Sequence, residues 1–185
     1  SILIIFKLFN RQYHFYLRLH VMLEIIKEIY NKPRTLISPA TRETLKYIKL
    51  KIGNMNFLYF KTGSKVFDWV IPSEWIIKEA YIKNKKGRKI LDFKKNLLSV
   101  VYYSTPINKW LSQKELKKNI YFDKKLKNAT PYVTSYYKKR WGFCMSKNNY
   151  DKLGSPKYKI FINSKFFKNK LEVGEKIISG KKNKE

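Results

Sequence analysis

The spacing of apolar residues changes from a helical to a strand-like period at Gly53, and this change constrains the fold class. Before Gly53, apolar side chains recur on one face of two predicted helices, over residues 22–30 and 39–52. Asn31-Lys32-Pro33 should end the first helix, because proline disfavours helical geometry in the residue before it. Ser38-Pro39 is placed to open the second helix, and Gly53 is placed to end it.

Short runs rich in aromatic and β-branched residues follow Gly53, and turn residues such as Gly63 and Pro72 separate them. The predicted strands cover residues 57–61, 66–70, 76–83, 89–93, 97–104, 157–163 and 171–179. Ser112 and Glu115 have the spacing of a capping box, which predicts a short helix over residues 112–118. We therefore expect an α+β protein with a β-rich middle.

Residues 1–21 differ from the rest of the chain. They are mostly apolar, with basic residues at helical spacing, namely Lys7, Arg11, His14 and Arg18. A basic amphipathic helix can lie on a membrane surface, but the apolar run at residues 1–6 is far shorter than the ~20 residues that span a bilayer. This extension is either such a helix, an ordinary packed helix or a segment foreign to the domain.

The chain is strongly basic. It has 185 residues and a formal net charge of +28, from 41 Lys and Arg against 13 Asp and Glu. Such a charge attracts nucleic acid or anionic membranes. The excess is nearly all Lys, however, and comes with many Asn, Ile, Tyr and Phe residues, which A/T-rich codons specify, so we do not expect nucleic acid as a partner. The single cysteine permits no internal disulfide and indicates the cytoplasm.

The usual catalytic patterns are missing. His14 and His20 are six residues apart, which does not suit a helical zinc pair. The carboxylates of the β-rich region are scattered and expected to be mostly solvated: Asp68, Glu74, Glu79 and Asp92. Cys144 stands between Phe143 and Met145, which favours a buried structural thiol over a nucleophile. We predict no catalytic residue and no metal ligand.

Aromatic and basic residues are most concentrated at residues 131–144, Pro-Tyr-Val-Thr-Ser-Tyr-Tyr-Lys-Lys-Arg-Trp-Gly-Phe-Cys. The candidate ligand contacts are Tyr132, Tyr136, Arg140 and Trp141. Such a stretch can stack the bases of single-stranded nucleic acid or bind an anionic or peptide ligand in a pocket. It can equally fill a core with its aromatics while its cations stay in water. Spacing alone leaves these alternatives open.

Three segments carry a resemblance to a known family. They are Lys-Thr-Gly-Ser-Lys-Val-Phe-Asp-Trp-Val-Ile-Pro-Ser-Glu-Trp at residues 61–75, Tyr-Tyr-Ser-Thr-Pro at residues 102–106, and residues 131–144. Arg34-Thr-Leu and Arg42-Glu-Thr-Leu fit the same pattern. From about Met22 onward, the chain resembles bacterial aminopeptidase-like proteins that carry the domains of unknown function 2172 and 4910 and are named as polysaccharide-biosynthesis proteins.

The resemblance implies a zinc-aminopeptidase-like α/β domain, of metallopeptidase clan MH type, that a β-rich module interrupts. Residues 1–21 would be an atypical extension and residues 22–62 the first piece of the aminopeptidase-like domain. Residues 63–145 would be the inserted module, and residues 146–185 the return into that domain. The boundaries rest on the resemblance alone.

The resemblance also carries an expectation about activity. The family continues into a strand with a His-x-Cys-His-Pro-Ser type motif, where its metal ligands begin, and this sequence ends before such a motif. We therefore expect an N-terminal portion of an aminopeptidase-like protein, incomplete and inactive alone. Zinc would belong to complete relatives, and a second chain is a possible partner that completes the domain. The alternative is a basic binding module for nucleic acid or an anionic glycan.

Overall fold

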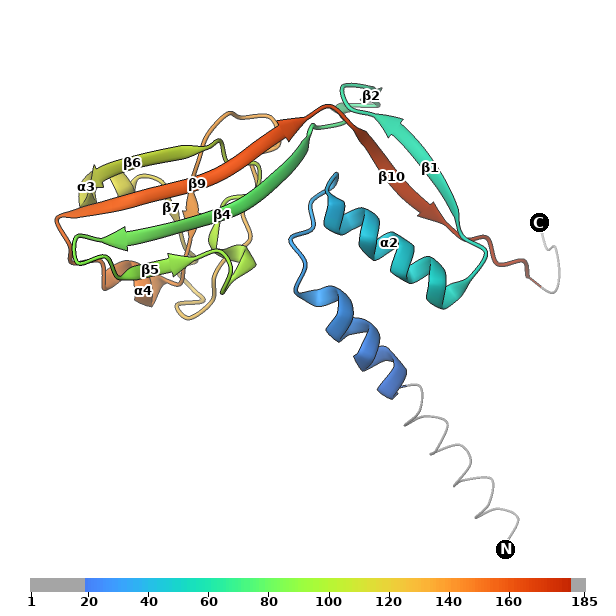
Figure 1. Ribbon diagram of the computed structural model, residues 1–185, viewed down its shortest axis with the longest axis horizontal. Helices are drawn as coiled ribbons and strands as arrows, with labels where there is room; N and C mark the ends of the chain where they lie inside the picture. Colours follow the sequence, from blue (N-terminus) through green and yellow to red (C-terminus); the bar gives the residue numbers. More distant parts are fainter. Residues whose placement is uncertain (1–18, 181–185) are drawn as a thin grey trace, which may run out of the picture. The chain divides into compact units, whose positions relative to one another are not determined.

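The computed structural model of the chain describes residues 19–180 (Figure 1). The chain divides into two units, residues 1–32 and 33–185. In the first unit, residues 19–30 form a helix that ends ahead of Pro33, as predicted. The predicted basic face of the extension, at residues 7, 11, 14 and 18, lies outside the described residues. Within residues 19–180, no helix combines the length and apolar character needed to cross a membrane.

The second unit has mixed α and β structure, which confirms the α+β class. Its main sheet has four antiparallel strands in the order β5-β4-β9-β6. The strands are β4 (Glu74–Asn84), β5 (Lys89–Asp92), β6 (Ile107–Ser112) and β9 (Lys157–Phe167). Because β9 pairs with both β4 and β6, this sheet depends on a strand that follows the predicted module boundary at residue 145.

A second sheet continues from the β4–β9 pair, and the two pairs of strands together form one long ribbon. Beyond Lys168 and Asn169, the chain continues from β9 into β10 (Lys170–Glu175), which pairs with β1 (Asn56–Lys61). Figure 1 shows β9 and β10 as one long strand with a bend between them. Between β1 and β4, the chain leaves the ribbon to form a small hairpin of β2 (Lys65–Val66) and β3 (Trp69–Val70).

Strand β4 contains a β-bulge, which changes which of its residue positions face the core. Trp75 is buried near its start, and Ala80 and Ile82 are buried after the bulge, where Lys78 is left without a partner in β9. An extra residue moves the following side chains to the other face of a strand. The bulge therefore keeps both halves of β4 on one core, against Ile160 and the other inward residues of β9.

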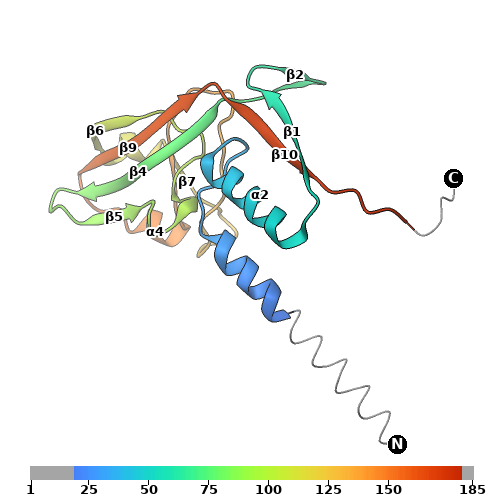
Figure 2. The same ribbon diagram turned by 45° about the vertical axis from the view of Figure 1, so that its right-hand side comes forward.

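Helix α2 (Pro39–Ile52) covers one face of the β1–β10 sheet, as Figure 1 and Figure 2 both show. Ser38 caps it and Gly53 ends it with φ 60°, as predicted. A Cβ atom at Gly174 would meet the sulfur of Met55 at 2.9 Å and Leu45 at 3.3 Å, so a larger residue there would force these side chains to shift. On the opposite face, Leu58, Phe60 and Val173 remain 41%, 42% and 39% exposed.

The irregular middle of the chain departs most from the predictions. The predicted strand over residues 97–104 is wrong: residues 97–99 form a 3₁₀ turn, and only Val100 and Tyr102 make isolated bridges. The predicted strand over residues 66–70 is interrupted by Phe67, which has φ 50°. The predicted helix over residues 112–118 is confirmed as α3 (Gln113–Lys117), with its capping box.

Three parts of the secondary structure were not predicted. Strand β6 lacks the β-branched run of its neighbours and exists because β9 offers it an edge. The other two are α4 (Lys147–Asp151) and the short parallel pair of β7 (Ile120–Tyr121) and β8 (Phe143–Cys144).

Candidate functional site

Residues 131–144 form a strip that runs between two other segments of the chain. Main-chain hydrogen bonds join Tyr102 N–H to the Val133 carbonyl at 2.9 Å and Thr105 N–H to the Arg140 carbonyl at 3.0 Å. On the other side, Phe143 N–H donates to the Asn119 carbonyl at 2.9 Å. Since these bonds satisfy buried main-chain groups without a regular sheet, the first role of this strip is to hold residues 100–105 against β7.

Arg140 fixes the shape of this strip. Its Nε donates to Ser135 Oγ at 3.1 Å, its Nη1 to Tyr121 Oη at 3.0 Å and its Nη2 to the Thr134 carbonyl at 3.3 Å. The guanidinium carbon also lies 5.2 Å from the centre of the Tyr121 ring. All three nitrogens therefore serve the protein itself. An additional contact from Arg140 to a ligand stays a prediction.

The tyrosines of the strip form the two ends of a row of aromatic rings that passes through the core. Neighbouring ring centres in this row lie 4.8 to 6.3 Å apart, in the order Tyr132, Tyr102, Trp75, Tyr103, Tyr136 and Tyr137. Trp75 and Tyr103 are buried, whereas Tyr132 and Tyr137 are 56% and 63% exposed. We call Tyr132, Tyr136 and Tyr137 the tyrosine surface. Trp141 packs instead against the core, with its ring edge-on to Phe143 at 6.3 Å.

The surroundings of Tyr132 keep its hydroxyl group neutral. Burial raises the pKa of Tyr132, and its hydrogen bond with Tyr136 raises it further. Tyr137 donates its hydroxyl to the Val70 carbonyl at 2.9 Å, which ties the strip to the β2–β3 hairpin. At neutral pH, Tyr132 therefore remains protonated and can act as a hydrogen-bond donor, not as an anion.

Cys144 is a buried thiol, as predicted. It has no exposed surface in β8, and burial raises its pKa from the ordinary value of 9.0 to about 12. Because the thiolate is the reactive form of cysteine, this environment does not suit a nucleophile.

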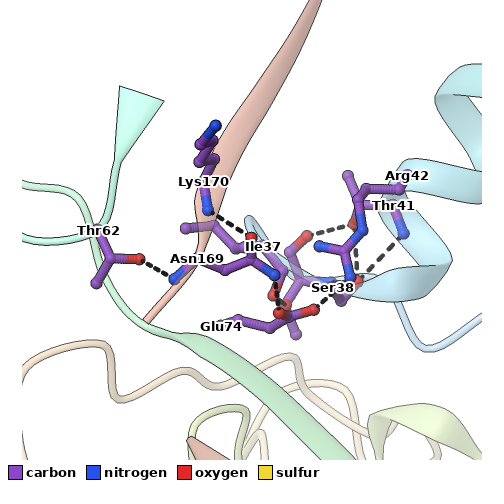
Figure 3. A network of polar contacts seen from close by, with 9 residues as sticks. Ile37, Ser38, Thr41, Arg42, Thr62, Glu74, Asn169 and Lys170 are labelled. Carbon is purple, nitrogen blue, oxygen red and sulfur yellow. Dashed lines mark hydrogen bonds and ion pairs between the residues drawn. The ribbon is translucent and has the colours of Figure 1, made fainter. Parts of the chain in front are cut away.

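A buried carboxylate lies at the bend between the two sheets (Figure 3). Glu74 is only 3% exposed. Its Oε1 accepts a hydrogen bond from Arg42 Nη2 of α2 at 2.7 Å, and its Oε2 accepts one from the side-chain amide of Asn169. Asn169 in turn receives the Thr62 N–H at its carbonyl, at 2.8 Å, and its own N–H donates to Thr62 Oγ1 at 3.1 Å. We call these four residues the bend network.

The expectation that the scattered carboxylates are mostly solvated is wrong for Glu74. No local spacing reveals this network, because Arg42, Glu74 and Asn169 are far apart in sequence. A signal was present, however: Arg42 and Glu74 both lie in segments that carry the family resemblance. Glu74 stands near the end of the motif at residues 61–75, and a charged residue in that place indicated a specific role that the sequence analysis missed.

Two buried polar atoms near the bend lack a hydrogen-bond partner within the described residues. They are Nη1 of Arg42 and the hydroxyl oxygen of Tyr103. Burial raises the pKa of Tyr103 to about 12, and its backbone is held at φ 66°, an uncommon conformation for a bulky residue. The Tyr103 hydroxyl therefore stays protonated, and the Thr35 side chain and the Ile37 main chain are its polar neighbours.

Metal ligands do not gather in the part of the chain that the structure describes. Within residues 19–180, no three side chains of His, Cys, Asp or Glu are grouped so that they could hold a metal ion. Zinc in proteins takes three or four such ligands. The described residues therefore do not fit the zinc ion that the family resemblance implies.

Comparisons with known proteins agree with the resemblance. Residues 74–165 match the family described as a domain of unknown function, DUF2172. A protein from Clostridium acetobutylicum, named for polysaccharide biosynthesis with an aminopeptidase-like domain, is 39% identical over 160 residues, which are 84% of this chain and 36% of that protein. A crystal structure from the same organism, described as a peptidase, matches with a TM-score of 0.76 and 38% identity, over 82% of this chain and 36% of that chain. This chain thus spans about a third of the length of these relatives.

The bend network predicts a large effect of a small substitution. Glu74→Gln should lower the free energy of unfolding by about 3 kcal/mol, because it leaves Arg42 without its opposite charge in a partly buried place. Urea unfolding monitored by tryptophan fluorescence measures this loss. The matched control is Glu79→Gln. The Glu79 carboxylate is 38% exposed, so this variant should lose far less free energy of unfolding. Equal losses in the two variants would contradict a special role for Glu74.

The buried thiol predicts a pH dependence. Below pH 9 the thiol of Cys144 is protonated in both states, whereas at higher pH only the unfolded chain loses the proton until the folded pKa of about 12 is reached. Stability should therefore fall as pH rises. Between about pH 8 and about pH 10, wild type should lose about 1 kcal/mol more than Cys144→Ala. Urea unfolding at both pH values gives the difference, and parallel losses would show that the thiol is not shielded.

Proposed function

The chain carries a DUF2172 domain over residues 74–165, and we propose that it forms the non-hydrolytic part of an aminopeptidase-like protein. One observation carries the proposal: the relative that is 39% identical to this chain is named for an aminopeptidase-like domain, and this chain spans 36% of it. Residues 19–180 supply no grouped metal ligands of their own. In this proposal, the residues that hold zinc and hydrolyse the substrate lie outside residues 19–180.

The elements around the DUF2172 domain are part of this proposal. Helix α2 and strands β1 and β10 lie outside residues 74–165, and we assign them to an incomplete aminopeptidase-like α/β domain. The DUF2172 domain is then an insertion between β1 and β10. Because β9 pairs within the four-stranded sheet, the return into the aminopeptidase-like domain fits best near Lys168.

One face of the β1–β10 sheet is apolar and exposed, as expected of a sheet that the rest of an aminopeptidase-like domain covers. Two strands alone are marginal in water, and α2 covers only one face. On the other face, register places Leu58 beside Val173 and Phe60 beside Leu171. Exposed apolar faces with unpaired strand edges are typical of surfaces that another part of a protein covers. We propose that the remaining two-thirds of an aminopeptidase-like chain occupies this face.

The tyrosine surface has a place in the same proposal. It joins the β2–β3 hairpin through Tyr137, and this hairpin follows the bend, where β1 ends and β10 begins. There, the hydroxyls of Tyr132 and Tyr136 would form hydrogen bonds with a substrate held by the aminopeptidase-like domain. Arg140 would support them by fixing the strip, while Trp141 would anchor the strip to the core.

The first test is a peptidase assay of the purified chain. With leucine p-nitroanilide and added zinc or cobalt, we expect no hydrolysis above the buffer rate, because residues 19–180 bring no metal ligands together. Release of p-nitroaniline is followed by absorbance. Hydrolysis that coelutes with the chain and is abolished by a chelator would overturn the proposal.

The second test concerns the apolar face. The chain is mixed with the part of the Clostridium acetobutylicum relative that lies outside the match, and complex formation is measured by calorimetry. We expect a complex that Phe60→Lys weakens at least about tenfold, since it buries a charge in an apolar contact. Leu126→Lys, at a residue 62% exposed and distant in sequence, is the matched control. No complex, or equal weakening by both variants, would contradict docking on this face.

A further inference from the structure

A pocket of about 410 Å³ lies at the end of the four-stranded sheet that is farthest along β4 from the bend. Its wall includes Arg88, Lys89 and Lys152, together with Asn84, Asn149 and Ser155. We propose that this pocket binds a phosphorylated sugar or a ligand of the same chemistry, with the phosphate on the basic residues and the hydroxyls on the polar ones. The pocket is separate from the tyrosine surface and from the apolar face of the β1–β10 sheet.

The charge of the wall favours an anion. No Asp or Glu is among the residues that line the pocket. Lys89 is partly neutralised by Asp92 at 2.9 Å and by Glu79 at 3.6 Å. Arg88 and Lys152, by contrast, take part in no ion pair among the residues that the structure describes. Two unpaired cations at one concave surface attract a phosphate group, and a guanidinium can bind two of its oxygens at once.

A third nearby carboxylate, besides Asp92 and Glu79, is also paired with a cation. Asp151 precedes Lys152 in the chain, and its Oδ2 lies 2.6 Å from Nζ of Lys147. The anion-attracting character of the wall therefore remains with Arg88 and Lys152.

The frame of the pocket is held in place without a ligand. The side-chain oxygen of Asn84 accepts the main-chain N–H of Arg88 at 3.0 Å, which fixes the hairpin between β4 and β5. Across the pocket, Ser155 N–H donates to Tyr158 Oη at 2.8 Å, and Tyr158 has no exposed surface. Fixing both walls in advance lowers the entropy that binding has to overcome.

The size and polarity of the pocket favour a sugar phosphate over a bare phosphate ion. Its volume lies within the range of small-molecule pockets, about 300–1,000 Å³. The amide of Asn149 and the hydroxyl of Ser155 are groups that suit the hydroxyls of a sugar. An extended nucleic-acid site would present a row of exposed aromatic rings beside its cations, whereas the one aromatic residue in this wall, Tyr158, is buried.

This inference does not depend on the proposed function. All residues of the wall lie between Asn84 and Tyr158, within the DUF2172 match. A chain without peptidase partners would keep the pocket intact.

The test is calorimetric titration of the full chain with three probes: glucose 6-phosphate, inorganic phosphate and glucose. We expect glucose 6-phosphate to bind more tightly than phosphate, and glucose to show no binding up to about 10 mM. The double variant Arg88→Gln/Lys152→Gln should weaken glucose 6-phosphate at least about tenfold, as expected for the loss of charge-assisted hydrogen bonds. In amide NMR spectra, Gly154 and Ser155 should shift in wild type.

The control removes the same charge elsewhere. Lys109→Gln/Lys124→Gln changes two exposed lysines that do not line the pocket, and it should keep the affinity within about twofold. Asn149→Trp fills the pocket without changing charge and should also abolish binding, which keeps the inference testable if the first variant is poorly folded. Equal weakening by the control pair, full binding by Asn149→Trp, or no binding of glucose 6-phosphate by wild type would overturn the inference.

Discussion

The contact between Glu74 and Arg42 joins helix α2 to the start of the main sheet, at the bend between the two sheets. Glu74 opens β4, Arg42 belongs to α2, and Asn169 stands where β9 becomes β10. A carboxylate that is 3% exposed is stable as a charge only if it is paired and hydrogen-bonded. These partners are available only when the helix, the first strand of the main sheet and the bend are all in place. The network therefore makes the bend specific, as well as contributing to stability.

The strip of residues 131–144 has a comparable structural role inside the main domain. A segment with five aromatic residues and three consecutive cations suggests a binding surface, but most of its groups are used by the protein itself. Arg140 donates to three internal oxygens, and Trp141 packs on the core. What remains for a ligand is the tyrosine surface, where Tyr132 keeps a protonated hydroxyl and the hydroxyl of Tyr137 is already bonded to the Val70 carbonyl. Most of the segment therefore serves the fold itself.

The two ends of the long β4–β9 ribbon present different chemistry. At the bend, the chain passes into a two-stranded sheet with an uncovered apolar face, which suits a protein contact. At the other end, the β4–β5 hairpin and the loop before β9 surround a basic pocket of small-molecule size. Strands β4 and β9 span both ends, so the proposed anion pocket and the proposed protein contact lie at opposite ends of the same pair of strands.

The sequence by itself determined the elements whose signals are local. The cap at Ser38, the end of α2 at Gly53 and the capping box of Ser112 and Glu115 depend only on neighbours within one turn, and all are present. The buried state of Cys144 also followed from its immediate neighbours. Only the tertiary structure decided the pairing of β6 with β9, the irregular path of residues 97–104, the burial of Glu74 and the basic pocket. Each of these depends on groups more than thirty residues apart in sequence, and the energy of such contacts is not expressed in any local pattern.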